Sequence, residues 1–285
     1  MKIIAGIVLF NPDIKRLIEN VNAVSSQVDE IIFFDNNSIN LNEIEAFVKR
    51  KNYQLIKSNK NYGIAHALNE LGKAAYYKKA DWFLTLDQDT VINLHLIEEY
   101  KKYMNLPRIG QLCCIFKDRN LRVKWDIPNG VKKSNFCITS ASLVNLRAWK
   151  EVGGFDESMF IDAVDNDFCA ALIRRGYFNY QIDFVGFIQE IGHATKHHFI
   201  YKDVYTLNHS AFRRYYIARN NMLIARRYKT ETNSVLRELM YRCREIIIII
   251  LFEKNKMTKL NNYFRGIIDG MTENTVRRNY LKDLK

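Results

Sequence analysis

The sequence predicts an α/β fold with a mainly parallel sheet flanked by helices, followed by a helical C-terminal region. In the first half, short apolar runs alternate with amphipathic segments of helical spacing. Strands separated by such segments join through right-handed crossovers and lie parallel. From residue 211 onward the pattern is almost entirely helical. We therefore expect one domain over residues 1–210, with residues 211–285 packed on it as a basic helical region.

Each expected element has its own signal in the chain. Apolar runs bounded by turn residues predict strands, and apolar residues at three- and four-residue spacing predict helices. In order, we expect strands at 3–10, 30–34, 53–57 and 81–86, with helices at 14–24, 41–50 and 63–77 between them. The second half is mixed, and there we expect a strand at 138–144, a turn at 155–160 and a helix at 165–175.

The composition is that of a globular protein, with 48% hydrophobic and 26% charged residues among 285. The apolar start lacks a cleavage site and predicts a first strand, not a signal peptide. Five cysteines without metal-ligand spacing indicate free thiols in a reducing compartment. The net charge of +12 gathers in the stretch from Arg213 onward. Such a surface could meet nucleic acid, anionic lipid or a phosphorylated substrate, or simply be solvated.

Two carboxylates, Asp87 and Asp89, stand one residue apart directly after the apolar run 82–86. Exposed carboxylates at the end of a buried strand repel each other, whereas a divalent cation between them and a phosphate would be held by oxygen ligands. A solvated Asp-rich turn is the alternative, and the three residues alone favour neither. Asn11 and Asp35 also follow strands directly, so three polar strand ends should share one edge of the sheet, where ligands bind in such folds.

A second acidic cluster contains Asp162, Asp165 and Asp167. Carboxylates this close need a cation or hydrogen bonds to offset their repulsion, and one of them could act as a general base. The alternative is that Asp165 or Asp167 caps the helix that follows.

Taken in order, seven segments give the chain a resemblance to the inverting glycosyltransferases of GT-A family 2, and most closely to their rhamnosyltransferase-type members. The resemblance covers roughly residues 3–228 and implies a GT-A, Rossmann-like fold. The segments are Phe10-Asn11-Pro12, Phe34-Asp35-Asn36-Asn37-Ser38, Asn61-Tyr62-Gly63-Ile64-Ala65, Leu86-Asp87-Gln88-Asp89, Gly153-Gly154-Phe155-Asp156-Glu157, Phe160-Ile161-Asp162-Ala163-Val164-Asp165-Asn166-Asp167 and His209-Ser210-Ala211-Phe212-Arg213-Arg214-Tyr215-Tyr216-Ile217-Ala218-Arg219-Asn220.

The resemblance implies a role for each matched position. Asp35 would contact the nucleotide base, and Asp87 the ribose or the metal. Asp89 would bind Mn2+ or Mg2+ bridging the donor diphosphate, and Asp165 would deprotonate the acceptor hydroxyl. Arg213, Arg214 and Arg219 are the candidates for stabilising the departing diphosphate. The further nucleotide-sugar contacts implied are Phe10, Asn11, Asn37, Asn61, Gly63 and Gln88.

The chain departs from the family pattern at two positions. The acidic motif carries Val164 where the family usually has Glu, a substitution typical of the rhamnosyl branch. A histidine common in the family is replaced by Gln189, so that a metal role would be vacant or taken by His193.

The resemblance implies the partners and the place of action. The donor would be a nucleoside-diphosphate sugar, dTDP-rhamnose or a UDP-sugar. The acceptor would be a saccharide used in bacterial cell-surface polysaccharide synthesis, and it could be linked to a lipid. We expect a cytoplasmic enzyme that could touch the inner face of the membrane through the apolar run 246–252. The same run could equally form a packed core or a homodimer interface.

Two other functions fit parts of the sequence. Asp87-Gln88-Asp89-Thr90-Val91 also fits the nucleophile motif of haloacid-dehalogenase-like phosphatases, in which Asp87 would attack phosphorus. Two earlier strand–helix units and the lack of a clear lysine motif argue against it. A non-catalytic basic binding module is the second alternative, but no known nucleic-acid motif is present and we expect no nucleic-acid partner.

Overall fold

The computed structural model describes residues 1–118, 130–189, 195–199, 202–228 and 235–284. These residues form two compact units, which are described separately. The first unit contains residues 1–160, 164–189 and 278–285, and the second contains 161–163 and 190–277. The predicted division into domains 1–210 and 211–285 is a different partition and stays a prediction.

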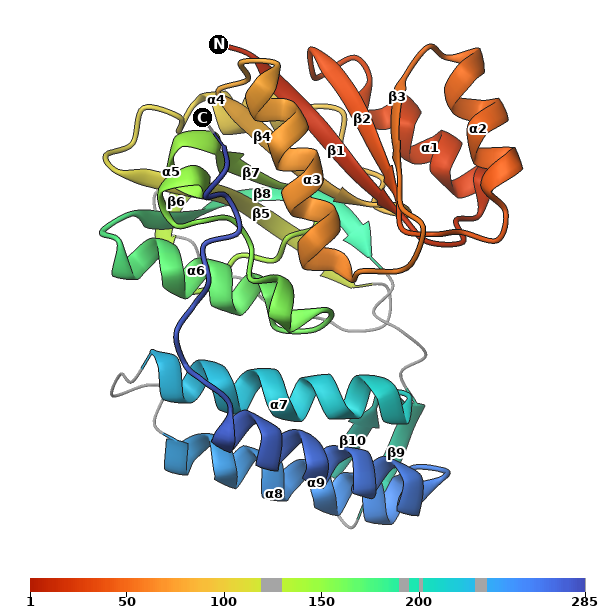
Figure 1. Ribbon diagram of the computed structural model, residues 1–285, viewed down its shortest axis with the longest axis vertical. Helices are drawn as coiled ribbons and strands as arrows, with labels where there is room; N and C mark the ends of the chain where they lie inside the picture. The colour runs from red at the N-terminus through yellow and green to blue at the C-terminus, as the bar shows by residue number, and fades with distance from the viewer. Residues whose placement is uncertain (119–129, 190–194, 200–201, 229–234, 285) are drawn as a thin grey trace. The chain divides into compact units, whose positions relative to one another are not determined.

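An eight-stranded mixed sheet forms the centre of the first unit, in the order β3-β2-β1-β4-β7-β5-β8-β6 (Figure 1). Pairing is parallel from β3 to β4 and between β5 and β8, whereas β7 and β6 run antiparallel to their neighbours. The strands are β1 Ile3–Leu9, β2 Glu30–Asp35, β3 Gln54–Lys57, β4 Trp82–Asp87, β5 Ile109–Asp118, β6 Val131–Ser134, β7 Ser142–Asn145 and β8 Phe178–Gln189. The mainly parallel α/β class is confirmed.

Successive side chains of each strand point to opposite faces of the sheet, and apolar side chains on both faces are buried under helices. On β1, Ile3, Ala5, Ile7 and Leu9 are buried in one cluster with apolar residues of α1, α2 and α4. On the other face, Gly6 leaves room for the Phe83 ring of the neighbouring strand and for α3, since a Cβ there would lie 2.4 Å from that ring and 3.1 Å from Leu71 Cβ of α3. The helices of this unit are α1 Ile14–Val24, α2 Leu41–Arg50, α3 Ile64–Tyr77, α4 Leu96–Lys101, α5 Leu146–Glu151 and α6 Val164–Arg174, with a 3-10 turn η2 at Glu157–Met159.

The strand predicted at 138–144 is wrong in its first part, since β7 begins only at Ser142. Ala141 has a φ of 59°, which turns the backbone before the strand begins. The Ser142 hydroxyl donates back to the Ile138 carbonyl and closes this turn. The result places Ser140 at the carboxyl end of β4, where the site lies.

Three helices and a two-stranded sheet make up the described part of the second unit. They are β9 Thr195–Phe199, β10 Lys202–Thr206, α7 Ala211–Arg227, α8 Val235–Phe252 and α9 Lys256–Thr272. The predicted start of the helical region at residue 211 is confirmed. Gly266 and Gly270 let α9 lie directly on α7, because a Cβ at either would come within 2.4 Å of an α7 carbonyl oxygen.

The apolar run 246–252 forms the end of α8, where some of its side chains are buried and others are exposed to solvent. Ile249 is fully buried beside Ala218 and Tyr263, whereas Ile247 and Ile250 are about half exposed, at 56% and 46%. Within the described ranges, no helix has both the length and the hydrophobicity that crossing a membrane requires.

Candidate active site at the carboxyl ends of the parallel strands

The strand register brings two predicted site residues, Asp35 and Asp87, to one edge of the sheet. Asp35, the last residue of β2, lies opposite Leu9 of β1, and Asp87, the last of β4, lies opposite Val8. Neighbouring strands are about 4.8 Å apart, so the Asp35 and Asp87 backbones are about 10 Å apart with the end of β1 between them. The expected shared edge is confirmed, and we call it the strand-end rim.

Each residue of the Asp87-Gln88-Asp89 turn is held by another part of the first unit. The Asn20 side chain on α1 donates to the Asp87 carbonyl at 2.7 Å. The Phe10 amide donates to Gln88 Oε1 at 2.8 Å, which ties the turn to the end of β1. Arg16 Nε donates to the Asp89 carbonyl at 3.1 Å. The turn is therefore fixed by protein contacts, and the Asp89 carboxylate is exposed.

The Asp87 carboxylate carries a charge that its surroundings disfavour. Burial raises its pKa, the Ser140 hydroxyl lowers it by donating to Oδ2, and the nearby charge of Asp89 raises it further. Ser140 is 3% exposed and comes from the segment before β7. Sequence patterns gave no signal for Ser140, because its partner is more than fifty positions away in the chain.

Asp35 organises the turn after β2 from a fully buried position. Its carboxylate accepts from the backbone amides of Asn37 at 3.2 Å and Ser38 at 3.1 Å. Asn11 joins the end of β1 to this turn, since its amide donates to Ser38 Oγ and its Oδ1 accepts from the Ile39 amide, both at 2.8 Å. Both Asn11 and Asn37 have positive φ, a conformation that asparagine tolerates. The implied base contact of Asp35 stays a prediction.

The loop before α3 is pinned to the rim by Asn36, which the prediction left without a role. Its side chain donates to the Gly63 carbonyl at 3.2 Å and accepts from the Tyr62 amide at 2.9 Å. Asn61 accepts from the Gly63 amide at 2.9 Å. Gly63 has a φ of 88°, and a Cβ there would lie 2.4 Å from the Phe160 carbonyl oxygen, so only glycine fits. The helix α3 begins directly after this loop, and an anion would be favoured at its N-terminus.

The second acidic cluster is divided by its surroundings. Asp162 belongs to the second unit and is bound there by Arg213 through Nη2 at 2.5 Å and Nε at 3.1 Å. Asp165 and Asp167 lie in the first turn of α6 in the first unit. Asp167 is fully buried, whereas Asp165 is half-buried and its Oδ1 accepts from the Asn166 amide at 2.9 Å.

The three arginines predicted to face the diphosphate lie on α7 in the second unit. Arg214 is 3% exposed, and its guanidinium bonds to Glu245 and Glu253. Arg219 bonds to Glu273 at 2.9 Å through Nε. These ion pairs give both arginines a structural role inside their own unit, so the implied contact between Arg214 and the nucleotide sugar stays a prediction. His193 lies outside the described residues.

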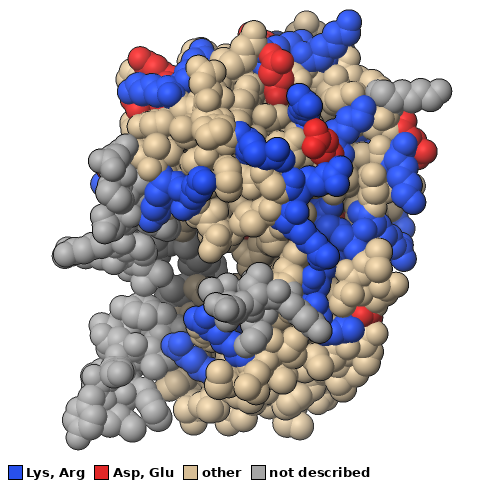
Figure 2. Space-filling view, turned by 90° about the vertical axis from the view of Figure 1, so that its left-hand side faces the viewer, with Lys and Arg blue, Asp and Glu red and all other residues tan. Residues whose placement is uncertain are grey.

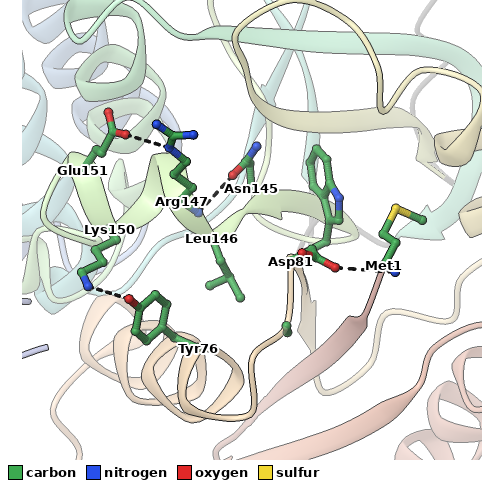
Figure 3. A pocket seen from close by; sticks show the side chains of 10 residues that line it. Met1, Tyr76, Asp81, Asn145, Leu146, Arg147, Lys150 and Glu151 are labelled. Carbon is green, nitrogen blue, oxygen red and sulfur yellow. Dashed lines mark hydrogen bonds and ion pairs between the residues drawn. The ribbon is translucent and has the colours of Figure 1, made fainter. Parts of the chain in front are cut away.

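A separate pocket of about 1020 Å³ lies at the opposite end of the sheet (Figure 3). Its lining includes Asp81 and Trp82 at the start of β4, about 20 Å along the strand from Asp87. The charged and polar side chains that line it pair with each other, as Lys150 does with Tyr76 at 2.6 Å and Arg147 with Glu151 at 3.3 Å. This pocket therefore takes no part in the site at the rim.

Residues 6–179 match the family model of Glycosyl transferase family 2. The chain belongs to this family, and it is therefore a glycosyltransferase of an inverting hexosyltransferase family. Membership replaces the two alternatives considered from sequence, a phosphatase with Asp87 as nucleophile and a non-catalytic binding module. The predicted family and enzyme class are confirmed.

A full-length relative and several solved structures extend the comparison. The chain is 26% identical over 94% of its length, and 95% of the relative's, to a protein of Shigella flexneri named dTDP-rhamnosyl transferase RfbF. The fold of the present chain matches that of S. aureus TarS 1-349 in complex with UDP-GlcNAc, with a TM-score of 0.63 at 14% identity over 94% of this chain and 82% of TarS 1-349. It also matches the mannosyltransferase PcManGT from Pyrobaculum calidifontis in complex with GDP-Man and Mn2+, with a TM-score of 0.60 at 13% identity over 96% and 76%. These likenesses support the GT-A fold.

Proposed function

We propose that the protein transfers rhamnose from dTDP-rhamnose to a saccharide acceptor in a reaction that needs Mn2+ or Mg2+. The observation that carries the proposal is the strand-end rim, where Asp35 and Asp87 end the two strands that flank β1 and Asp89 follows in the next turn. The choice of rhamnose and deoxythymidine rests on the full-length relative alone. A UDP-sugar is the second donor, since the TarS structure contains UDP-GlcNAc on the same fold.

The residues of the rim fit a divalent cation. Asp87 and Asp89 offer oxygen ligands. Burial, and then the nearby charge of Asp89, raise the pKa of Asp87, and a positive charge at this position would offset both effects. Among the residues the structure describes, no group of three or more acidic, histidine or cysteine side chains gathers into a metal site. A cation held by one or two carboxylates takes its other ligands from substrate phosphates and water, as Mg2+ commonly does. When bound, such a cation would neutralise charge that develops on the leaving diphosphate.

Asp165 is the proposed general base. In an inverting transfer, a base removes the proton of the acceptor hydroxyl while the hydroxyl oxygen attacks the anomeric carbon and the nucleoside diphosphate leaves from the opposite side. Of the three carboxylates in the second acidic cluster, Asp167 is buried and Asp162 is bound to Arg213. Asp165 combines partial exposure with a fixed position on a helix, which suits a proton acceptor.

We place the enzyme in the cytoplasm, with contact to the inner face of the membrane through α8 and a lipid-linked acceptor there. The outward side of α8 supports this, because Ile247, Ile250 and Leu251 are each about half exposed. On the face that Figure 2 shows, Lys and Arg gather more densely than Asp and Glu, which suits an anionic surface. A homodimer through the same helices is the alternative use of these side chains.

Thermal shifts with nucleotides test the donor and the metal together. We expect dTDP with Mn2+ to stabilise the wild type more than UDP or GDP does, and Asp89→Ala to remove the Mn2+-dependent part. A larger shift with GDP or UDP would exclude the rhamnose donor but leave the glycosyltransferase class intact. Stabilisation that ignores both Mn2+ and Asp89 would exclude the metal bridge.

Transfer assays test the base. Asp165→Asn should bind donor normally and lose transfer by about 10²–10⁴-fold, the usual contribution of a general base. Asn166→Ala, the neighbouring substitution on the same helical turn, should keep transfer. Full transfer by Asp165→Asn would mean that another residue accepts the proton.

A further inference from the structure

The end of the chain belongs to the first unit, although the helices before it belong to the second. Residues 278–284, the dark-blue end of the ribbon in Figure 1, are called the C-terminal strap here. Leu281 and Leu284 of the strap are 4% and 7% exposed, so the strap is packed and not merely a solvated tail. No periodic pattern in the sequence announces this packing.

The strap packs against the loop 153–160, which carries the matched glycines and ends five residues before Asp165. Two contacts of the Tyr280 hydroxyl hold this loop, since it donates to Asp156 Oδ1 at 2.8 Å and accepts from the Ser158 amide at 3.2 Å. The Tyr280 amide donates to the Gly153 carbonyl at 3.1 Å. Burial raises the pKa of Tyr280 to about 12, with the charge of Asp156 next in effect, so the hydroxyl keeps its proton near neutral pH.

The two glycines of this loop are required by the same packing. Gly153 has a φ of 80°, and a Cβ there would come 2.9 Å from the Asn279 side chain of the strap. Gly154 has a φ of 79°, and a Cβ there would lie 2.5 Å from Asn69 Oδ1 and 3.2 Å from Leu281 Cγ. Loop, strap and α3 are therefore in close contact at these two positions.

On its other side the loop is joined to α3 and the rim. Glu157 bonds through Oε2 to His66 Nδ1 at 2.7 Å and through Oε1 to the Asn69 amide group at 2.8 Å. Although burial alone would raise it, these hydrogen bonds hold the pKa of Glu157 below its usual value. The Phe160 carbonyl accepts from the Ile64 amide at 2.7 Å, next to the glycine that Asn36 pins to the rim. The side chains of His66 and Glu157 keep 24% and 22% exposure, so a bound molecule can reach them.

We propose that the C-terminal strap positions the 153–160 loop, and that Tyr280 is a positioning residue that holds Glu157 against α3 at the edge of the donor site. The inference rests on the proposed function for the identity of that site. The strap acts through the loop, because Tyr280 touches Asp156 and Ser158 on either side of Glu157.

Hydrogen exchange tests the strap without any need for activity. Tyr280→Phe keeps the ring and removes both hydroxyl contacts, and we expect amides of the 153–160 loop to exchange about tenfold faster. Exchange in α2 should stay unchanged. Tyr77→Phe, which removes the hydroxyl of a tyrosine that is 63% exposed, is the matched control and should leave the loop as it is. Unchanged loop exchange in Tyr280→Phe would overturn the strap.

Kinetics test the positioning role. Tyr280→Phe should lower kcat about tenfold and change the donor KM by less than about twofold, while the melting temperature changes little. The effects of Tyr280→Phe and Asp156→Ala should add to less than their sum in the double variant, because both remove the hydrogen bond between Tyr280 and Asp156. Faster loop exchange with an unchanged kcat would overturn the positioning role. If the wild type transferred no sugar, the proposed function would fail, and the exchange result would still decide the strap.

Discussion

Ser140 should control how tightly the rim binds a cation. Ser140→Ala removes the hydroxyl that donates to Asp87 and leaves the carboxylate in the same partly buried place. A hydrogen bond to a charged group is worth about 1.5–3 kcal/mol. If the full amount is lost from the ionised form of Asp87, Mn2+ affinity falls by about 10- to 150-fold at a pH below the pKa of Asp87, where the protonated carboxyl competes with the cation. Asp87 must be ionised to bind the cation, so the loss falls on binding.

The assay is titration calorimetry of Mn2+ in the presence of a saturating nucleoside diphosphate, repeated at several pH values. In the wild type, binding should weaken as the pH falls through the raised pKa of Asp87. Removal of the Ser140 hydroxyl raises that pKa further, so the same weakening should begin at a higher pH in Ser140→Ala.

Ser142→Ala is the matched control for this experiment. The Ser142 hydroxyl is equally buried two positions away, but it donates to the neutral Ile138 carbonyl. Its loss should reduce stability by about 0.5–1.5 kcal/mol and leave Mn2+ affinity unchanged. Equal Mn2+ affinity in Ser140→Ala and wild type, or equal weakening in both variants, would refute the link between Ser140 and the cation.

Three more results are expected in the second unit. Arg214→Met leaves Glu245 without its cation and leaves the buried Glu253 with Lys259 alone. It should lower the free energy of unfolding by about 3 kcal/mol, measured by denaturant titration, whereas Arg244→Met on the exposed side of α8 should change it by less than about 0.5 kcal/mol. Gly270→Ala places a Cβ 2.4 Å from the Arg219 carbonyl oxygen. This overpacking should lower the free energy of unfolding by about 1–3 kcal/mol, and the melting temperature should fall with it. Burial, followed in effect by nearby arginine charges, lowers the pKa of His209 from 6.5 to about 4. As the pH drops from 6.5 to 4, the unfolded chain is therefore protonated at His209 before the folded one, and the free energy of unfolding falls by up to about 3 kcal/mol. His209→Gln should reduce this dependence of stability on pH.

The first half of the fold could be predicted because its signals are local. Each strand–helix unit there carries its own apolar period, and the helix 14–24 begins and ends where the pattern does. Asp13 caps that helix by accepting from the Arg16 amide three residues ahead. Signals that span only a few residues can be recognised in the sequence alone.

The second half could not be predicted in the same way, because its pairings are distant. β5 pairs in parallel with β8, which begins about sixty residues after the end of β5, and the register shifts three times along the pair. Two antiparallel strands, β6 and β7, are inserted into the same sheet. An apolar run such as 138–144 indicates that its side chains are buried, but it does not show where the backbone turns. In the structure the turn lies at Ala141, which has a positive φ.

The same difference in range divides the site. The acidic pair was found because two carboxylates follow a buried strand, which is a local pattern. Ser140, Asn20 and Tyr280 were missed because each meets its partner only through the tertiary fold. Their roles are to hold the acidic turn and the 153–160 loop in place, and a residue that holds another has no motif of its own.

The contacts of the acidic turn also bear on how a cation would bind there. Asn20, the Phe10 amide and Arg16 hold the three residues of the turn, and Ser140 holds the Asp87 carboxylate. All the partners in these bonds are protein groups, so the binding energy of a cation need not order the turn and can serve the diphosphate instead. The same arrangement raises the pKa of Asp87, chiefly through burial and further through the nearby charge of Asp89. Asp87→Asn should therefore bind no Mn2+ and, by removing that repulsion while keeping the Ser140 bond, unfold at a higher temperature than the cation-free wild type; a lower melting temperature would show that the ionised carboxylate stabilises the fold.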